Sequence, residues 1–135
     1  MSLIVPDVAE VDALTKILTP ALTLKLYGNN YNPVPASVAA NFTEIAGGGY
    51  ANKPLIFAGW AIVAGAPSLA TYGIQTWNFT GAINAPATIY GFFVTRNSDG
   101  LLMWCERFAA GVVPIVPIVG SVISVTPVFS GSSVY

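Results

Sequence analysis

Two long stretches of this sequence, Pro54–Thr95 and Phe108–Tyr135, contain no charged residue. Charged residues make up 8% of the 135-residue chain, whereas a typical soluble domain is about 25% charged. A folded domain of this size exposes roughly 6,700 Å². The five basic and six acidic residues give such a surface a low density of charge. We therefore expect part of the surface to be covered by other protein. The alternative is a monomer whose surface consists of Ser, Thr, Asn and Gly.

The residues that are present exclude most catalytic chemistry. The chain has no histidine, so nucleophile–histidine pairs and histidine-based zinc sites are impossible. Only three acidic residues, Glu44, Asp99 and Glu106, follow the first 20 residues. A turn explains Asp99, which disfavours a paired-carboxylate site. Gly47–Gly49 lacks the Lys and Ser/Thr of a phosphate-binding loop. We expect no catalytic residue, no metal site and no cofactor, and hence not an enzyme.

The same composition argues against nucleic acid and membrane as partners. The five Lys and Arg residues are scattered, whereas binding to phosphates needs them clustered. The apolar runs Leu55–Pro67 and Ala109–Val125 are interrupted by proline and glycine, so we expect strands and turns there instead of a membrane-spanning helix. The single cysteine, Cys105, excludes an intrachain disulfide and is predicted to be a small buried hydrophobe.

One short helix is predicted near the start of the sequence. Asp7 is placed to cap it, with Glu10 three residues later as in a capping box, and Thr19-Pro20 ends it. Glu10, Asp12 and Lys16 are expected to lie largely away from its apolar face. That face is formed by residues at near-helical spacing: Val8, Val11, Leu14, Ile17 and Leu18. We expect it to pack on the rest of the domain or on a neighbouring protein.

After Pro20 the sequence has the pattern of a β protein. Leucines alternate with polar residues in Leu22–Tyr27, as in a half-buried strand, and Gly28–Ser37 has the composition of a loop. Asn97–Gly100 is a strong hairpin signal, because Asp-Gly supplies the positive φ that such turns need. Further strands are predicted at Phe42–Ala46, Leu55–Val63, Ile74–Thr80, Ile89–Thr95, Leu101–Phe108, Val112–Val119 and Val122–Phe129.

These elements predict a mainly β fold. Short strands with turns every 8–12 residues favour a two-sheet antiparallel β-sandwich, jelly-roll-like, of about eight strands with one short N-terminal helix. We expect a single domain overall, with an N-terminal arm and helix at residues 1–20 and the β-sandwich at residues 21–135.

Two groups of residues are candidates for contact with other molecules. The first is apolar and lies in the helix and the uncharged C-terminal stretch: Val8, Val11, Leu14, Val112, Val113, Ile115, Val116, Ile118, Val128 and Phe129. The second is a possible polar contact loop: Asn29, Asn30, Tyr31 and Asn32. Turn formation also explains this loop. The three tryptophans, Trp60, Trp77 and Trp104, suit core and interface anchors better than sugar-stacking platforms.

Several motifs, taken in order along nearly the whole chain, resemble a family of small structural proteins of tailed bacteriophages. Ala9 and Ser121 stand where the family pattern tends to have Gly and Asp. The motifs are Val5-Pro6-Asp7-Val8 with Glu10, Leu22-Thr23-Leu24-Lys25-Leu26-Tyr27 followed by Asn29-Asn30, Thr43-Glu44, Gly49-Tyr50, Trp60, Gly65-Ala66-Pro67, Tyr90-Gly91 with Phe93-Val94, Gly100 with Leu102 and Trp104, Glu106-Arg107-Phe108, and Gly120 leading to Val125-Thr126-Pro127.

The resemblance implies a virion component with a β-sandwich fold and no catalytic residues. The expected function is that of a capsid decoration or cement protein on the phage head; the alternative is a tail or adhesin-type module that binds a receptor or glycan. The expected partners are the major capsid protein or other virion proteins. A homo-oligomer is also expected, with a trimer favoured because shells offer threefold positions. The protein would be made in the host bacterial cytoplasm and reside on the capsid surface.

Overall fold

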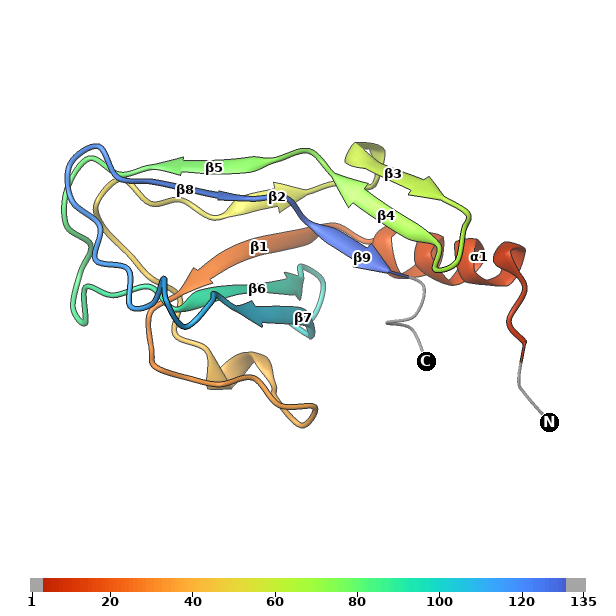
Figure 1. Ribbon diagram of the computed structural model, residues 1–135, viewed down its shortest axis with the longest axis horizontal. Coiled ribbons are helices and arrows are strands. Elements are labelled where there is room, and N and C mark those ends of the chain that lie inside the picture. Colours follow the sequence, from red (N-terminus) through yellow and green to blue (C-terminus); the bar gives the residue numbers. More distant parts are fainter. Residues whose placement is uncertain (1–3, 131–135) are drawn as a thin grey trace.

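The computed structural model describes residues 4–130, which form a mainly β protein with one helix (Figure 1). All sheets are antiparallel, and the described residues contain nine strands instead of the expected eight or so. The elements are α1 (Asp7–Leu18), β1 (Leu22–Tyr27), β2 (Lys53–Leu55), β3 (Trp60–Val63), β4 (Leu69–Tyr72), β5 (Gln75–Asn78), β6 (Gly91–Arg96), β7 (Leu102–Arg107), β8 (Val122–Val125) and β9 (Val128–Ser130).

The largest sheet has the strand order β2-β1-β6-β7. The alternation predicted for β1 is confirmed, because Leu22, Leu24 and Leu26 are fully buried on one face. Leu24 lies opposite Val94 of β6 and Leu26 lies opposite Phe92. Side chains with this period share one face of a sheet, so the leucines line the face of the large sheet that packs against the core.

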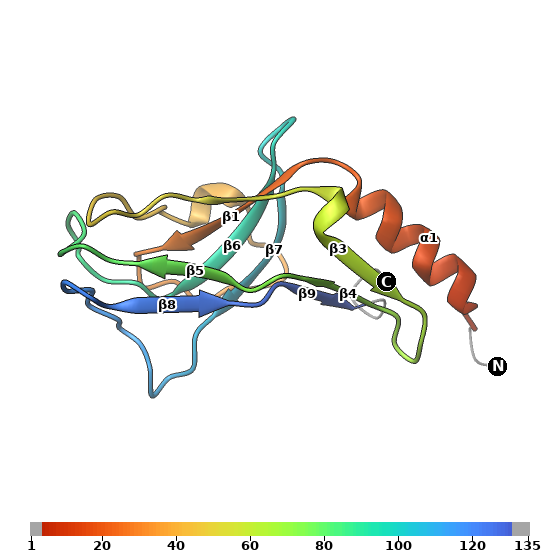
Figure 2. The same cartoon turned by 90° about the horizontal axis from the view of Figure 1, so that it is seen from above.

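A second layer lies over this face and consists of the sheets β3-β4-β9 and β5-β8 (Figures 1 and 2). The two sheets are joined, because β4 leads into β5 and β8 leads into β9, and the backbone N–H of Tyr72 donates to the carbonyl of Pro127 between them (2.9 Å). The paired strands thus form one kinked ribbon. Trp60, Trp77 and Phe129 of this layer belong to the same buried cluster as the leucines of β1.

The predicted helix is confirmed as α1, but two of its expected features are wrong. Asp7 does not cap it: the N-cap position is Pro6, which makes no side-chain capping hydrogen bond. Glu10 does not face away from the apolar side. It is buried with Leu14 and Leu18, since residues four apart lie on one helix face. Its Oε2 accepts a hydrogen bond from the Ser68 backbone N–H (3.1 Å), which offsets the cost of burying a carboxylate.

Four expected strands differ from the structure. Val112–Val119 is not a strand: within it only Ile115 forms a bridge, to Ile89. Proline, which lacks a backbone donor, occurs twice there. The predicted strand Leu55–Val63 is interrupted by a 3₁₀ turn at Phe57–Gly59, and Phe42–Ala46 contributes only a bridge from Glu44 to Tyr27. The predicted strand at residues 122–129 is divided into β8 and β9.

Other predictions hold. The turn Asn97–Gly100 joins β6 to β7, and Gly100 has a φ of 73°. The loop predicted at Gly28–Ser37 contains no strand. Strand β4 was not predicted, because its sequence around Leu69–Tyr72 mixes small, polar and aromatic residues without a clear alternation of apolar and polar side chains. Residues 1–3 and 131–135 of the expected domain ranges lie outside the described residues.

Candidate functional site

The structure separates charged from uncharged elements. Strands β3, β4, β5, β8 and β9 contain no charged residue, and together they make up the second layer, here called the charge-free layer. The eleven charged residues lie in α1, in the β2-β1-β6-β7 sheet and in the loops and turns attached to it. Two segments that are far apart in the sequence are therefore brought together as one uncharged layer (Figure 2).

The outer side of the charge-free layer carries a cluster of exposed aliphatic side chains, here called the aliphatic patch and formed by Ala61, Val63, Leu69 and Val128. Val63 of β3 lies directly opposite Leu69 of β4, and Val128 of β9 lies opposite Thr71, two residues further along β4. Val63 and Val128 are 64% and 49% exposed, and Leu69 is 40% exposed. Because cross-strand neighbours on one face lie side by side, Val63 and Leu69 form an apolar pair, and Ala61 and Val128 lie on either side of Thr71 in the next row.

The expected apolar contact residues fall into three groups. Two are wrong as surface residues, because Leu14 and Phe129 are buried inside this chain, against β3 and within the core. Three are half-buried: Val11, Val113 and Ile115. The other five are exposed and are available for contact: Val8, Val112, Val116, Ile118 and Val128. Of these, only Val128 belongs to the aliphatic patch.

In the expected polar contact loop, two residues are used to hold the chain itself together. The Asn29 side chain donates to the Asn41 carbonyl (2.8 Å) and accepts from the Thr43 N–H (2.9 Å). Tyr31 packs edge-on against Phe42 and its hydroxyl bonds to Ser37 (2.7 Å). Asn30 and Asn32 are exposed. Loop structure thus accounts for half of this set.

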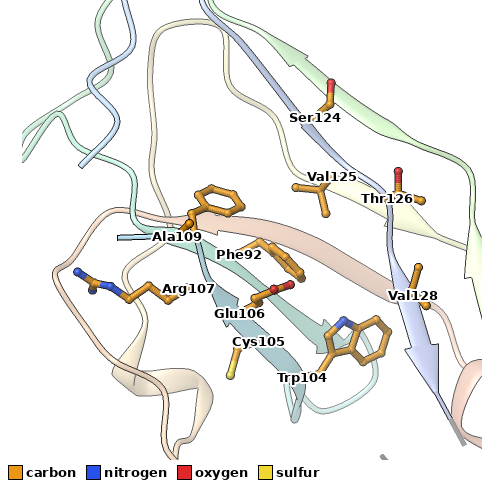
Figure 3. Close-up of a pocket in the computed structure, with 11 residues that line it drawn as sticks. Phe92, Trp104, Cys105, Glu106, Arg107, Ala109, Ser124, Val125, Thr126 and Val128 are labelled. Atoms are coloured by element: carbon orange, nitrogen blue, oxygen red, sulfur yellow. The ribbon is translucent and has the colours of Figure 1, made fainter. Parts of the chain in front are cut away.

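A groove of about 550 Å³ runs between β7 and the β8–β9 segment (Figure 3). Phe92 and Trp104 point into it from the large sheet, and Val125 points toward them from β8. Glu106 also projects into it, and its side chain is exposed there. Sequence reasoning missed this groove, because it is formed by strands whose pairing partners could not be assigned from the sequence.

Two of the acidic residues considered in the sequence analysis, Glu44 and Asp99, have structural partners. The Tyr50 hydroxyl donates to Glu44 (2.7 Å) and accepts from the Leu26 N–H (3.1 Å), which ties the triple-glycine segment to β1. Burial and the Glu44 carboxylate raise the pKa of Tyr50, so its hydroxyl stays protonated. The Arg96 guanidinium bonds to Asp99 and lowers the pKa of that carboxyl to about 2.

The environment of Cys105 does not activate its thiol. Burial raises the pKa of the Cys105 thiol, which disfavours the nucleophilic thiolate. The thiol is half-buried, which is less than expected for a core hydrophobe. Among residues 4–130, no group of three or more cysteine and acidic side chains is arranged to hold a metal ion. No helix in the same range is both long enough and apolar enough to cross a bilayer.

Comparison with known proteins gives no family assignment. No family model matches this chain, and neither curated protein sequences nor solved structures include a significant match.

Proposed function

We propose that this protein is a non-enzymatic structural component of a virion, and that it acts as a decoration or cement protein on a bacteriophage capsid. The observation that carries the proposal is the charge-free layer with its aliphatic patch. Apolar surface gains about 25 cal/mol for each Å² removed from water. A layer without charges can meet another protein without the cost of desolvating ionic groups.

The proposal includes the partners and the place of action. The aliphatic patch, together with the exposed residues Val112, Val116 and Ile118, contacts the major capsid protein or a neighbouring copy. A homo-oligomer, with a trimer favoured, would repeat these contacts over the capsid surface, where multivalency makes weak contacts persistent. The protein would be synthesised in the cytoplasm of the bacterial host. No cofactor, nucleic acid or membrane takes part.

The fold that we propose for this role is a two-sheet β-sandwich related to the jelly roll. Two antiparallel layers that share one buried cluster support the sandwich. The strand order β2-β1-β6-β7 and the kinked ribbon of the second layer supply the crossing connections that a jelly roll also has.

The alternative function, a tail or adhesin-type module that binds a receptor or glycan, has less support. Such a module presents aromatic side chains as platforms for sugar rings. Trp60 and Trp77 are almost fully buried, and Trp104 packs against Trp60 and Phe129. A cement protein does not need exposed tryptophans.

The direct test is binding of the purified protein to shells of the parent phage that lack it. The wild-type protein should sediment with the shells, and cryo-electron microscopy should show it on their outer surface. Leu69→Lys places a charge in the aliphatic patch and should weaken binding by about tenfold or more. Ser98→Lys adds the same charge in the exposed β6–β7 turn and should bind normally. The proposal would be overturned if the protein stays monomeric at high concentration and does not sediment with the shells.

A further inference from the structure

A second hollow lies where the loop after β1 meets the end of β7. Its volume is about 500 Å³, which is within the range of small-ligand pockets. Among the described residues that line it, Arg107 alone is charged, and we call it the Arg107 hollow. The side chains that matter for its chemistry are those of Asn30, Asn32, Tyr90, Arg107, Phe108 and Pro114.

The Arg107 guanidinium is held in place without an acidic partner. Its Nη1 donates to the Tyr31 carbonyl (3.1 Å), and the guanidinium stacks over the Tyr90 ring, 4.8 Å from the ring centroid. Glu106 precedes it in β7, but successive side chains of a strand point to opposite faces, and Figure 3 shows these two pointing apart. Within residues 4–130, Arg107 forms no ion pair. The Tyr31 carbonyl uses one of the five N–H donors of the guanidinium, so donors remain for an anion.

Two side-chain amides supply the other polar groups of the hollow. Asn30 and Asn32 are exposed, and neither side chain bonds to another described residue. Asn29, in contrast, is bonded to Asn41 and Thr43. Within the expected polar contact loop, the two asparagines that the fold does not use are therefore the two that line the Arg107 hollow. A free amide both donates and accepts hydrogen bonds, as a sugar hydroxyl does.

These groups together specify the chemistry of a ligand. One guanidinium without a second cation suits a single negative charge, and its planar fork matches a carboxylate. The amides of Asn30 and Asn32 suit hydroxyls that lie beside this carboxylate. The apolar walls formed by Phe108 and Pro114 suit the C–H faces of a ring. A ring that carries several hydroxyls and one carboxylate is an acidic sugar.

We propose that the Arg107 hollow binds an acidic sugar residue, whose carboxylate pairs with Arg107 and whose hydroxyls bond to Asn30 and Asn32. An Asp or Glu side chain of another protein brings a carboxylate but no ring of hydroxyls. The inference adds a binding activity and does not rest on the proposed structural role. The hollow shares no residue with the aliphatic patch, so the shell-binding test can succeed or fail without affecting it.

The test is an NMR titration of the labelled full-length protein with methyl β-glucuronide and with methyl β-glucoside, the matched sugar without a carboxylate. The glucuronide should shift the amide signals of residues 30–32 and 107–113 saturably. It should bind about tenfold or more tightly than the glucoside, because only the glucuronide makes charge-assisted hydrogen bonds. Arg107→Gln should reduce this preference to less than about twofold. Lys16→Gln removes the same charge from α1 and should retain the preference.

A second pair of variants keeps the test independent of the role of Arg107 in holding the loop. Asn30→Ala and Asn32→Ala remove amides that make no bond within the described residues, so thermal unfolding should be unchanged. Each should weaken the binding of both sugars by about threefold or more, because a hydrogen bond to a hydroxyl is lost. Asn78→Ala, which removes an exposed amide from β5, should bind both sugars normally.

Several outcomes would overturn the inference. One is an absence of saturable shifts at residues 30–32 and 107–113, and another is equal affinity for the glucuronide and the glucoside. Normal binding of both sugars by Asn30→Ala and Asn32→Ala would exclude the amides from the site. Equally tight binding of a blocked Ala-Glu-Ala peptide would assign the hollow to an acidic side chain, and equally tight binding of inorganic phosphate would assign it to a phosphate group.

Discussion

Glu10 illustrates how a single residue can take a structural role that its sequence position conceals. It is the only charged side chain among residues 4–130 that is buried. Its spacing from Asp7 indicated a capping box, yet it shares a helix face with Leu14 and Leu18. There it receives the Ser68 N–H from the turn between β3 and β4. Local sequence cannot show this partner, because the two residues lie 58 positions apart.

The contact predicts a measurable loss of stability. Glu10→Ala should lower the free energy of unfolding by about 1–3 kcal/mol, because the Ser68 N–H would be left buried without an acceptor. Glu10→Gln keeps an acceptor for the Ser68 N–H, so its free energy of unfolding should lie between those of Glu10→Ala and the wild-type protein. Urea denaturation gives these values.

The matched control for Glu10 is the neighbouring acidic residue Asp12. Asp12→Ala removes only an exposed ion pair with Lys16, so the free energy of unfolding should change little, because solvent screens exposed ion pairs. Equal losses for Glu10→Ala and Asp12→Ala would show that the buried hydrogen bond has no special weight.

At the scale of elements, strong local signals predicted the structure well, and long-range pairing could not be predicted. The strand Leu22–Tyr27 and the turn Asn97–Gly100 were identifiable because alternation and an Asp-Gly pair act within a few residues. The apolar residues of Val112–Val119 predicted a strand, but the two prolines in this segment cannot donate the backbone hydrogen bonds that pair one strand with another. The groove beside Glu106 depends on which strands lie at the edges of the sheets, and the local sequence pattern does not predict which strands those are.

Close packing within the large sheet gives a prediction about Gly91. A Cβ there would overlap the Glu106 carbonyl oxygen and lie 2.7 Å from the Tyr27 ring. Gly91→Ala should therefore destabilise the protein by about 1–3 kcal/mol, as over-packing does. Gly73→Ala, at the bend between β4 and β5, meets nothing within 4 Å and should change stability by less than about 1 kcal/mol. Thermal unfolding of the two variants checks this. A neutral Gly91→Ala would contradict the packing argument.

At the scale of the whole molecule, the main feature is the segregation of charge. Ionic groups lie on α1 and the large sheet with its loops, and the charge-free layer has none. Composition alone showed the deficit of charge. Only the fold showed that two uncharged segments of the sequence meet in one layer, and that Leu14 and Phe129 are used inside the chain instead of at its surface.

This segregation predicts how assembly responds to salt. At 1 M ionic strength the Debye length is about 3 Å, so contacts between exposed charges are largely screened. Self-association or shell binding through the charge-free layer should be undiminished between 0.1 and 1 M NaCl, and sulfate should strengthen it. Sedimentation across this range provides the measurement. A steep loss of binding with salt would assign the contact to the charged elements instead.

The kinked ribbon also sets the order in which the molecule can be completed during synthesis. Within the described residues, strand β5 pairs only with β8. Strand β4 pairs with β3 along one edge and with β9 along the other. Strands β8 and β9 emerge from the ribosome after every other described strand. The layer that we assign to assembly is therefore finished last. A nascent chain cannot present the complete aliphatic patch, including Val128, until the large sheet beneath it has already been made.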